Sequence, residues 1–218
     1  LMHDPLCGGQ VYRHIKYPQQ LLLKSEFIRD ALIRIAKFSL IDDVFVEPSG
    51  ENGYRMRARF HVGHRSVGFL REGTHQVCKV SLTGQLRKET EHIVSMLGKG
   101  VDGVLSDAIA YVDLSENIKG DQQVIHVELE RGAKSERIRS WVAKIPCTGV
   151  TCGNVGSQLV KKVRGIPTVF DPLSVVAGAK GSVVLSRHAT AFFQGNRFLL
   201  PELVAEVCKN VSSGPVID

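Results

Sequence analysis

Three arginines alternate with apolar residues in the stretch "YRMRARF", at positions 54–60. In a strand, Arg55, Arg57 and Arg59 would point to one face and the residues between them to the core. Guanidinium groups spaced about 6.5 to 7 Å apart match the phosphates along one nucleic-acid strand, and each can bind two phosphate oxygens. A solvated face with carboxylates on the neighbouring strand is the alternative. The nearby basic side chains favour a binding face: Arg65, Arg71 and Lys79.

The thiols and imidazoles do not form a metal-binding pattern. The five cysteines are scattered as Cys7, Cys78, Cys147, Cys152 and Cys208. Cys147 and Cys152 have no second pair to complete a zinc ribbon, so small buried thiols are expected. His61 and His64 have metal-like spacing but no acidic or thiol neighbours, which predicts surface histidines.

Catalytic signatures of the common enzyme classes do not occur in the sequence. The chain contains no GxSxG, HExxH or GxxxxGK[ST]. The glycine-rich "GVTCGNVG" lacks GxGxxG spacing, and strand-like residues rather than a helix follow it, which argues against a phosphate cradle. No residue within the 218 is therefore assigned a catalytic role, and no metal ligand is assigned either.

Charge and composition restrict the class of protein. The chain has 28 basic and 22 acidic residues, a net charge of +6, and 43% hydrophobic residues, which predicts a globular protein that suits a polyanionic partner. An odd number of scattered cysteines does not resemble a secreted disulfide framework, so a cytoplasmic location is expected. No apolar run approaches the roughly 18 residues that span a bilayer, so no membrane partner is expected.

The elements that would position these residues follow from hydrophobic periodicity. Helices are expected over "PQQLLLKSEFIRDALIRIAKF", "TGQLRKETEHIVSML", "SERIRSWVAKI" with Ser135 as cap, and from Phe198 through "LLPELVAEVCKNV". Strands are expected from Gly53, in a meander joined by Gly63, Gly68 and Gly73, and in a hairpin of "DAIAYVDL" with "QQVIHVELER". Residues 146–180 should hold further strands.

Three stretches in this order resemble one family, the S-adenosylmethionine-dependent RNA (uracil-C5) methyltransferases, which form 5-methyluridine in ribosomal or transfer RNA. The stretches are "CGGQVYRHIKYPQQLLLKSEFIRDALIRI", "GYRMRARFHV" with "VGFLREGTHQV", and "AFFQGNRFLLPELVAEV" leading to "GPVID". The resemblance implies RNA as partner, S-adenosylmethionine as cofactor, and an enzyme as the parent protein.

The resemblance also implies roles for individual residues. Gln194 matches the family glutamine that contacts the cofactor, and Phe192 and Phe193 match aromatic residues that line the cofactor and target-base region. Two core phenylalanines and a helix-capping glutamine are the alternative. Arg57 and Arg59 match the family's arginine strand, which implies RNA contact.

The reaction of this family needs a nucleophile and a base that the residues named above do not supply. A thiolate must add to uracil C6 and a base must remove the C5 proton, and the resemblance implies a cysteine and a glutamate beyond Asp218 for these steps. Cys208 precedes the cofactor strand, of which Val216, Ile217 and Asp218 are the start, so packing is its expected role. Residues 1–218 are thus expected to be a truncated fragment, inactive alone.

One departure from the family concerns iron. Many relatives hold an iron–sulfur cluster with C-x5-C-G-G-C and a later cysteine; here Cys7 fits the second position, while Leu1, Gln10 and approximately Thr83 occupy the others. One thiolate cannot hold such a cluster, so none is expected.

The expected fold class is α+β, with a mostly antiparallel central sheet, flanking helices and the truncated start of a Rossmann-like methyltransferase domain. The expected divisions are 1–47, an irregular segment and a helix that would pack on that domain; 48–186, the central domain; and 187–218, the start of the methyltransferase domain. The exposed helix predicts self-association. The rival functions are a non-catalytic RNA-binding module and an interaction domain with an incidental basic face.

Overall fold

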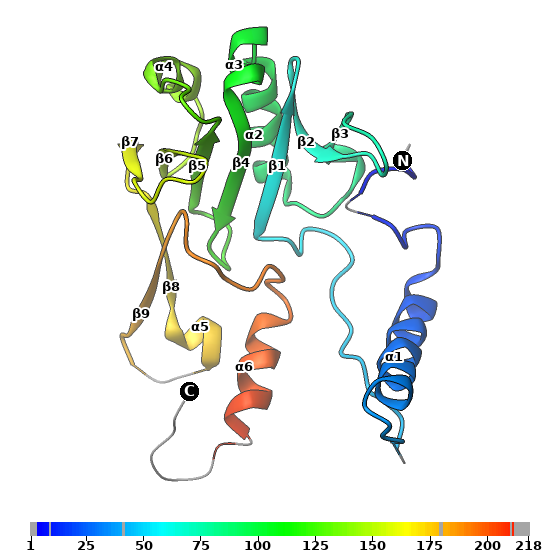
Figure 1. The fold of residues 1–218 in the computed structure, drawn as a ribbon. Helices are drawn as coiled ribbons and strands as arrows, with labels where there is room; N and C mark the ends of the chain where they lie inside the picture. The colour runs from blue at the N-terminus through cyan, green and yellow to red at the C-terminus, as the bar shows by residue number, and fades with distance from the viewer. Residues whose placement is uncertain (1–3, 9, 41, 179–180, 210, 212–218) are drawn as a thin grey trace.

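A seven-stranded sheet forms the centre of the computed structural model, which describes residues 4–8, 10–40, 42–178, 181–209 and 211 (Figure 1). The strand order is β3-β2-β1-β4-β5-β6-β7, and β5 with β6 is a parallel pair while the other neighbours are antiparallel. The strands are β1 (Arg57–Gly63), β2 (Ser66–Leu70), β3 (Val77–Lys79), β4 (Ile109–Glu116), β5 (Gln123–Leu129), β6 (Gly149–Asn154) and β7 (Lys161–Gly165). The expected mostly antiparallel central sheet is confirmed.

Helices cover one face of this sheet. They are α2 (Lys88–Lys99), α3 (Gly103–Ala108) and α4 (Glu136–Val142), with a 3₁₀ turn η1 (Val80–Leu82) after β3. The predicted stripe on α2 is buried, since Ile93 and Leu97 are at most 2% exposed. Trp141 of α4 donates its indole N–H to the Leu97 carbonyl at 3.0 Å, so the two helices share the main core with β1, β4, β5 and β6.

A second layer lies below the sheet. It comprises a two-stranded sheet of β8 (Thr168–Pro172) and β9 (Val184–His188), with helices α5 (Leu173–Ala177) and α6 (Leu200–Lys209) beside it (Figure 1). A smaller core formed by Met56, Val176 and Leu200 joins these elements to the residues that precede β1. The chain between β9 and α6 is therefore packed against the start of β1.

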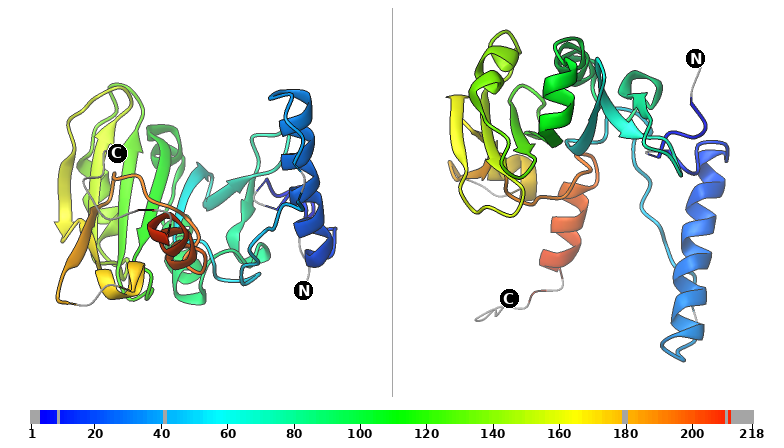
Figure 2. Two further views of the ribbon diagram at one scale, coloured as in Figure 1. Left: turned by 90° about the horizontal axis from the view of Figure 1, so that it is seen from below. Right: turned by 45° about the horizontal axis from the view of Figure 1, so that its top comes forward.

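Helix α1 (Tyr17–Arg34) stands away from the rest of the molecule in both views of Figure 2. None of its residues is buried, and Leu22 and Phe27 are each more than half exposed. Its predicted extent is confirmed to within a few residues, and so is the expected exposure of its apolar side chains.

Several local predictions were wrong. Gly68 lies inside β2 rather than at a turn. The position requires glycine, because a Cβ there would come within 2.1 Å of the Cys78 carbonyl oxygen on β3. The short helices α3 and α5 were not expected, and α6 begins at Leu200 instead of Phe198. Ser135 occupies the N-cap position of α4 as expected, but its side chain makes no capping hydrogen bond.

The sequence did not predict that two of the cysteines are bonded to each other. Cys7 and Cys78 form a disulfide that ties the N-terminal segment to β3. This bond also removes the cysteine-based reason for expecting a reducing compartment. Cys147, Cys152 and Cys208 are free, and burial raises the pKa of the Cys147 and Cys152 thiols.

Candidate functional site

The segment between β9 and α6 carries three of the predicted site residues, Phe192, Phe193 and Gln194. Its backbone pairs with the chain that enters β1: the Met56 N–H donates to the Gly195 carbonyl at 2.8 Å, and Arg197 N–H donates to the Tyr54 carbonyl at 2.9 Å. This pairing brings residues about 140 positions apart into one place. The predicted residues Arg57, Phe192 and Gln194 therefore lie in the same part of the molecule.

A buried arginine holds the start of the segment. Arg187, at 4% exposure, donates to Asp171 at 2.7 Å, to the Glu116 carbonyl at 2.9 Å and to the Ser115 hydroxyl at 3.2 Å. Its guanidinium carbon also lies 3.9 Å from the Phe193 ring centroid. Phe193 packs into the smaller core, so this phenylalanine supports the segment rather than facing solvent.

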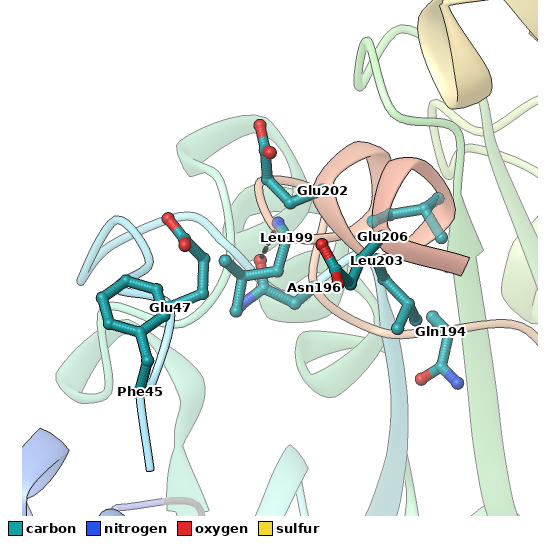
Figure 3. A pocket seen from close by; sticks show the side chains of 9 residues that line it. Phe45, Glu47, Gln194, Asn196, Leu199, Glu202, Leu203 and Glu206 are labelled. Carbon is teal, nitrogen blue, oxygen red and sulfur yellow. Dashed lines mark hydrogen bonds between the residues drawn. The ribbon is translucent and has the colours of Figure 1, made fainter. Parts of the chain in front are cut away.

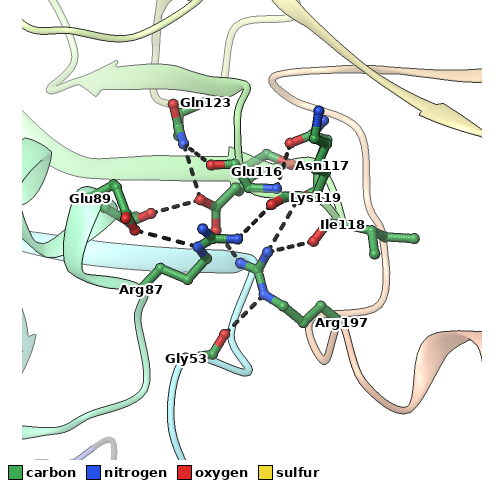
Figure 4. Close-up of polar contacts among 12 residues, drawn as sticks. Gly53, Arg87, Glu89, Glu116, Asn117, Ile118, Lys119, Gln123 and Arg197 are labelled. Carbon is green, nitrogen blue, oxygen red and sulfur yellow. Dashed lines mark hydrogen bonds and ion pairs between the residues drawn. The ribbon is translucent and has the colours of Figure 1, made fainter. Parts of the chain in front are cut away.

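A second buried arginine holds the end of the segment (Figure 4). Arg197 forms an ion pair with the fully buried Glu116 and donates to the Gly53 carbonyl at 2.9 Å and the Ile118 carbonyl at 2.7 Å. Glu116 also accepts from Thr90 at 2.8 Å and Gln123 at 3.1 Å. The carboxylate and guanidinium are both multiply hydrogen-bonded, as a buried ion pair requires.

Sequence reasoning missed these anchors. In the sequence, Arg187, Arg197, Glu116 and Asp171 look like ordinary surface charges, since each stands alone beside polar or turn residues. The only available signal was the position of two arginines on either side of "AFFQGN". Their burial depends on contacts between distant parts of the chain.

Phe192 differs from its neighbour because it is 76% exposed. The Arg57 guanidinium carbon lies 5.5 Å from the Phe192 ring centroid, within the range of a cation–π contact. An exposed ring beside a guanidinium is a surface on which a nucleic-acid base can stack. The alternative expectation, two core phenylalanines, therefore describes Phe193 and not Phe192.

Gln194 lines a cavity of about 680 Å³ between residues 45–47 and α6 (Figure 3). The wall combines apolar side chains with Gln194, Asn196 and the carboxylates of Glu47, Glu202 and Glu206. The Gln194 amide makes no hydrogen bond within the part of the chain that the structure describes, so it is available to a ligand. The size is typical of small-molecule sites, and the carboxylates favour a ligand with positive charge.

The three arginines do not form one free cationic face. Arg59 donates to both Asp113 oxygens at 2.9 and 3.0 Å and lies over Tyr111, and the Asp113 hydrogen bonds raise the pKa of Arg59. Arg55 lies over Phe69 of the main core. The alternative, a face with carboxylates on the neighbouring strand, is correct for Arg59. Arg57 has no carboxylate partner among the described residues.

The positions matched to iron–sulfur ligands do come together in part. The Gln10 side chain donates to the Thr83 carbonyl. The disulfide of Cys7 with Cys78 joins the same two segments of the chain. Leu1 lies outside the described residues, as do Val216, Ile217 and Asp218 of the expected cofactor strand. Within the described residues, no group of three or more His, Cys, Asp or Glu side chains is arranged to hold a metal ion. No described helix is long and apolar enough to cross a membrane.

Comparisons with known proteins give relatives over most of the chain, although no family model matches. An uncharacterized RNA methyltransferase of Nitratidesulfovibrio vulgaris is 27% identical over 92% of this chain and 47% of its own length. Another from Synechocystis is 21% identical over 87% of this chain and 45% of its own length. The chain spans about half the length of these curated relatives.

One solved structure shares the fold. It is the Pyrococcus abyssi tRNA (uracil-54, C5)-methyltransferase in complex with S-adenosyl-L-homocysteine, with a TM-score of 0.65 and 21% identity over 96% of this chain and 52% of that one. The curated relatives confirm the expected resemblance to RNA methyltransferases, and the solved structure shows that the fold is shared.

Proposed function

We propose that residues 1–218 form the RNA-contacting central part of an S-adenosylmethionine-dependent RNA (uracil-C5) methyltransferase and one wall of its active site. The observation that carries the proposal is the segment 188–197, fixed at both ends by buried ion pairs, which presents an exposed Phe192 next to a cavity that Gln194 lines. The curated relatives, named as RNA methyltransferases, support it.

In this proposal the Phe192 ring and the Gln194 amide have separate roles. Phe192 stacks on a base of the RNA and Arg57 beside it contacts phosphate. Gln194 hydrogen-bonds the cofactor, whose positively charged sulfonium suits the carboxylates of Glu47 and Glu202 in the wall. S-adenosylmethionine supplies the methyl group when it is bound. Arg59 is also proposed to contact RNA phosphate, but more weakly than Arg57, because Asp113 already neutralises the Arg59 charge.

The domain roles are part of the proposal. Residues 1–47 supply a helix that packs on the methyltransferase domain, residues 48–186 form the central domain, and residues 187–218 lead into the methyltransferase domain. The relatives are about twice as long as the matched region, which supports a nucleophile and a base supplied from outside it. The proposed location is the cytoplasm, and the substrate is ribosomal or transfer RNA.

The test is methyl transfer from labelled S-adenosylmethionine to RNA transcripts, with protein expressed from its complete reading frame. We expect Gln194→Ala to raise the KM for the cofactor about tenfold, because one hydrogen bond contributes about 1.4 kcal/mol. Phe192→Ala should weaken RNA binding about 5- to 100-fold through lost stacking. Phe170→Ala, a partly exposed ring on β8, is the matched control.

The main alternative is a non-catalytic RNA-binding module. RNA binding that depends on Phe192 without any methyl transfer, from a reading frame without a later cysteine and glutamate, would favour that alternative. Unchanged RNA affinity after Phe192→Ala and Arg57→Ala would reject both functions and leave an interaction domain.

A further inference from the structure

The positive charge of the chain is concentrated in one part of the sequence. Residues 130–164 contain eight lysines and arginines and two glutamates, while the rest of the chain contains twenty basic and twenty acidic residues. The whole excess of +6 therefore belongs to this one stretch. The arginines of β1, which first suggested a polyanionic partner, lie outside it.

In the fold this stretch forms one corner of the molecule. It contains α4, β6 and β7, and β7 is the edge strand at the opposite end of the sheet from β3 (Figure 1). Ile138, Trp141 and Val142 turn one side of α4 into the core, so its basic residues remain on the outer side. The corner thus exposes lysines and arginines from a helix and from an adjacent sheet edge.

Most of these cations have no carboxylate partner. Arg137 pairs with Asp102 at 3.2 Å, and Arg164 donates to the carbonyls of Val142 and Cys147. The other six are exposed, and no ion pair engages them within the described residues. They are Arg131, Lys134, Arg139, Lys144, Lys161 and Lys162, here called the α4–β7 patch. Lysines on an edge strand also discourage aggregation, but that role does not explain the residues around α4.

A continuous row of paired residues connects this patch with the candidate site. Across the sheet face that lies opposite the helices, Arg59 pairs with Asp113, Asp113 with His126, His126 with Thr151, and Thr151 with Lys162. His126 hydrogen-bonds Thr151 at 2.9 Å and Glu128 at 2.8 Å, so hydrogen bonds fix the side chains in the middle of the row. At one end Arg59 is paired with Asp113, and at the other end Lys162 is exposed. At about 4.8 Å per strand, β1 and β7 are about 19 Å apart, a distance that one folded RNA can span.

We propose that the α4–β7 patch is a docking surface for the phosphate backbone of RNA, separate from the site at Phe192 and Gln194. Unpaired lysines and arginines spread over a helix and a strand edge bind phosphates without reading sequence. The choice of RNA as the occupant rests on the proposed function. The patch holds the RNA body at the β7 edge while the target base reaches the segment 188–197.

The experiment compares two variants, each of which loses four positive charges, at different places on the surface. The patch variant is Lys134→Gln, Lys144→Gln, Lys161→Gln and Lys162→Gln. The control variant is Lys16→Gln, Lys24→Gln, Lys37→Gln and Lys99→Gln, exposed lysines outside the patch. A labelled stem-loop RNA is titrated by fluorescence anisotropy at several salt concentrations, and circular dichroism verifies that both variants are folded.

We expect the patch variant to lose about 10- to 100-fold in affinity at low salt, with a salt dependence weakened by about 2 to 3 units of slope. The control variant should lose less than about threefold. Equal losses in the two variants, or wild-type binding by the patch variant, would overturn the proposal. A vesicle-binding assay provides a second test. If the patch variant lost binding to phosphatidylserine vesicles that the wild type shows, and still bound RNA like the wild type, the proposal would also be overturned. The binding readout does not use methyl transfer, so absence of methyl transfer would count against the proposed function alone.

Discussion

At the scale of residues, the candidate site depends on charges that lie beneath it. Arg187 and Arg197 are almost fully buried, and each pairs with a buried carboxylate, Arg187 with Asp171 on β8 and Arg197 with Glu116 on β4. A buried ion pair of this kind contributes little net stability against an apolar substitute, but leaving one partner alone is costly. The two ion pairs fix the segment that contains Phe192 and Gln194. The pairs therefore position the site without contacting a ligand themselves.

Removal of Arg187 should therefore have a large effect on stability. We expect Arg187→Met to lower the free energy of unfolding by about 3 to 5 kcal/mol, because Asp171 is left buried and unpaired. Arg34→Met, which breaks the exposed pair with Asp30, should cost less than about 0.5 kcal/mol. Urea unfolding followed by circular dichroism measures both.

The double variant Arg187→Met with Asp171→Leu separates charge from packing. Since it removes both charges, it should recover a large part of the lost stability. A double variant as unstable as Arg187→Met alone would mean that packing against Phe193, and not the stranded carboxylate, accounts for the loss.

At the scale of elements, the sequence predicted what periodicity determines. The α1, α2 and α4 helices and the β4–β5 hairpin follow from apolar residues at helical or alternating spacing. The short helices α3 and α5 were missed because one or two turns carry too little periodicity. Gly68 and the arginine anchors were missed because their contacts, Cys78 on β3 and Glu116 on β4, come from other parts of the chain.

The Cys7–Cys78 disulfide makes a prediction about the N-terminal segment. Alkylation of the denatured protein should modify the three free cysteines without reductant and all five cysteines after reduction, as counted by mass spectrometry. Cys78→Ser should lower the free energy of unfolding by about 2 to 4 kcal/mol, because the bond closes a long loop. Cys208→Ser, an exposed position on α6, is the control.

Modification of all five cysteines in the unreduced protein would show that the bond does not form. In that case the N-terminal segment would be held by the pairs of Arg71 with Asp4 and of Gln10 with Thr83.

At the scale of the whole molecule, two helices project from the body with apolar residues in solvent. In α1, Leu22 and Phe27 are 56% and 52% exposed, and in α6, Val207 is 59% exposed. Most helical stability in proteins comes from packing of the apolar face, so exposed apolar faces of this kind need a covering surface. For residues 1–218 alone, the surface available in solution is a second copy of the chain.

We therefore predict that residues 1–218 self-associate through α1. Light scattering should give a mass that rises with concentration above the 24.0 kDa of one chain. Leu22→Gln with Phe27→Gln should shift the molecule toward monomer, because glutamine keeps helix propensity and removes the apolar contact. Val104→Gln with Val175→Gln, exposed positions on α3 and α5, should leave the association unchanged. A single 24.0 kDa species at every concentration would contradict this prediction, and it would mean that α1 is stable without a partner surface.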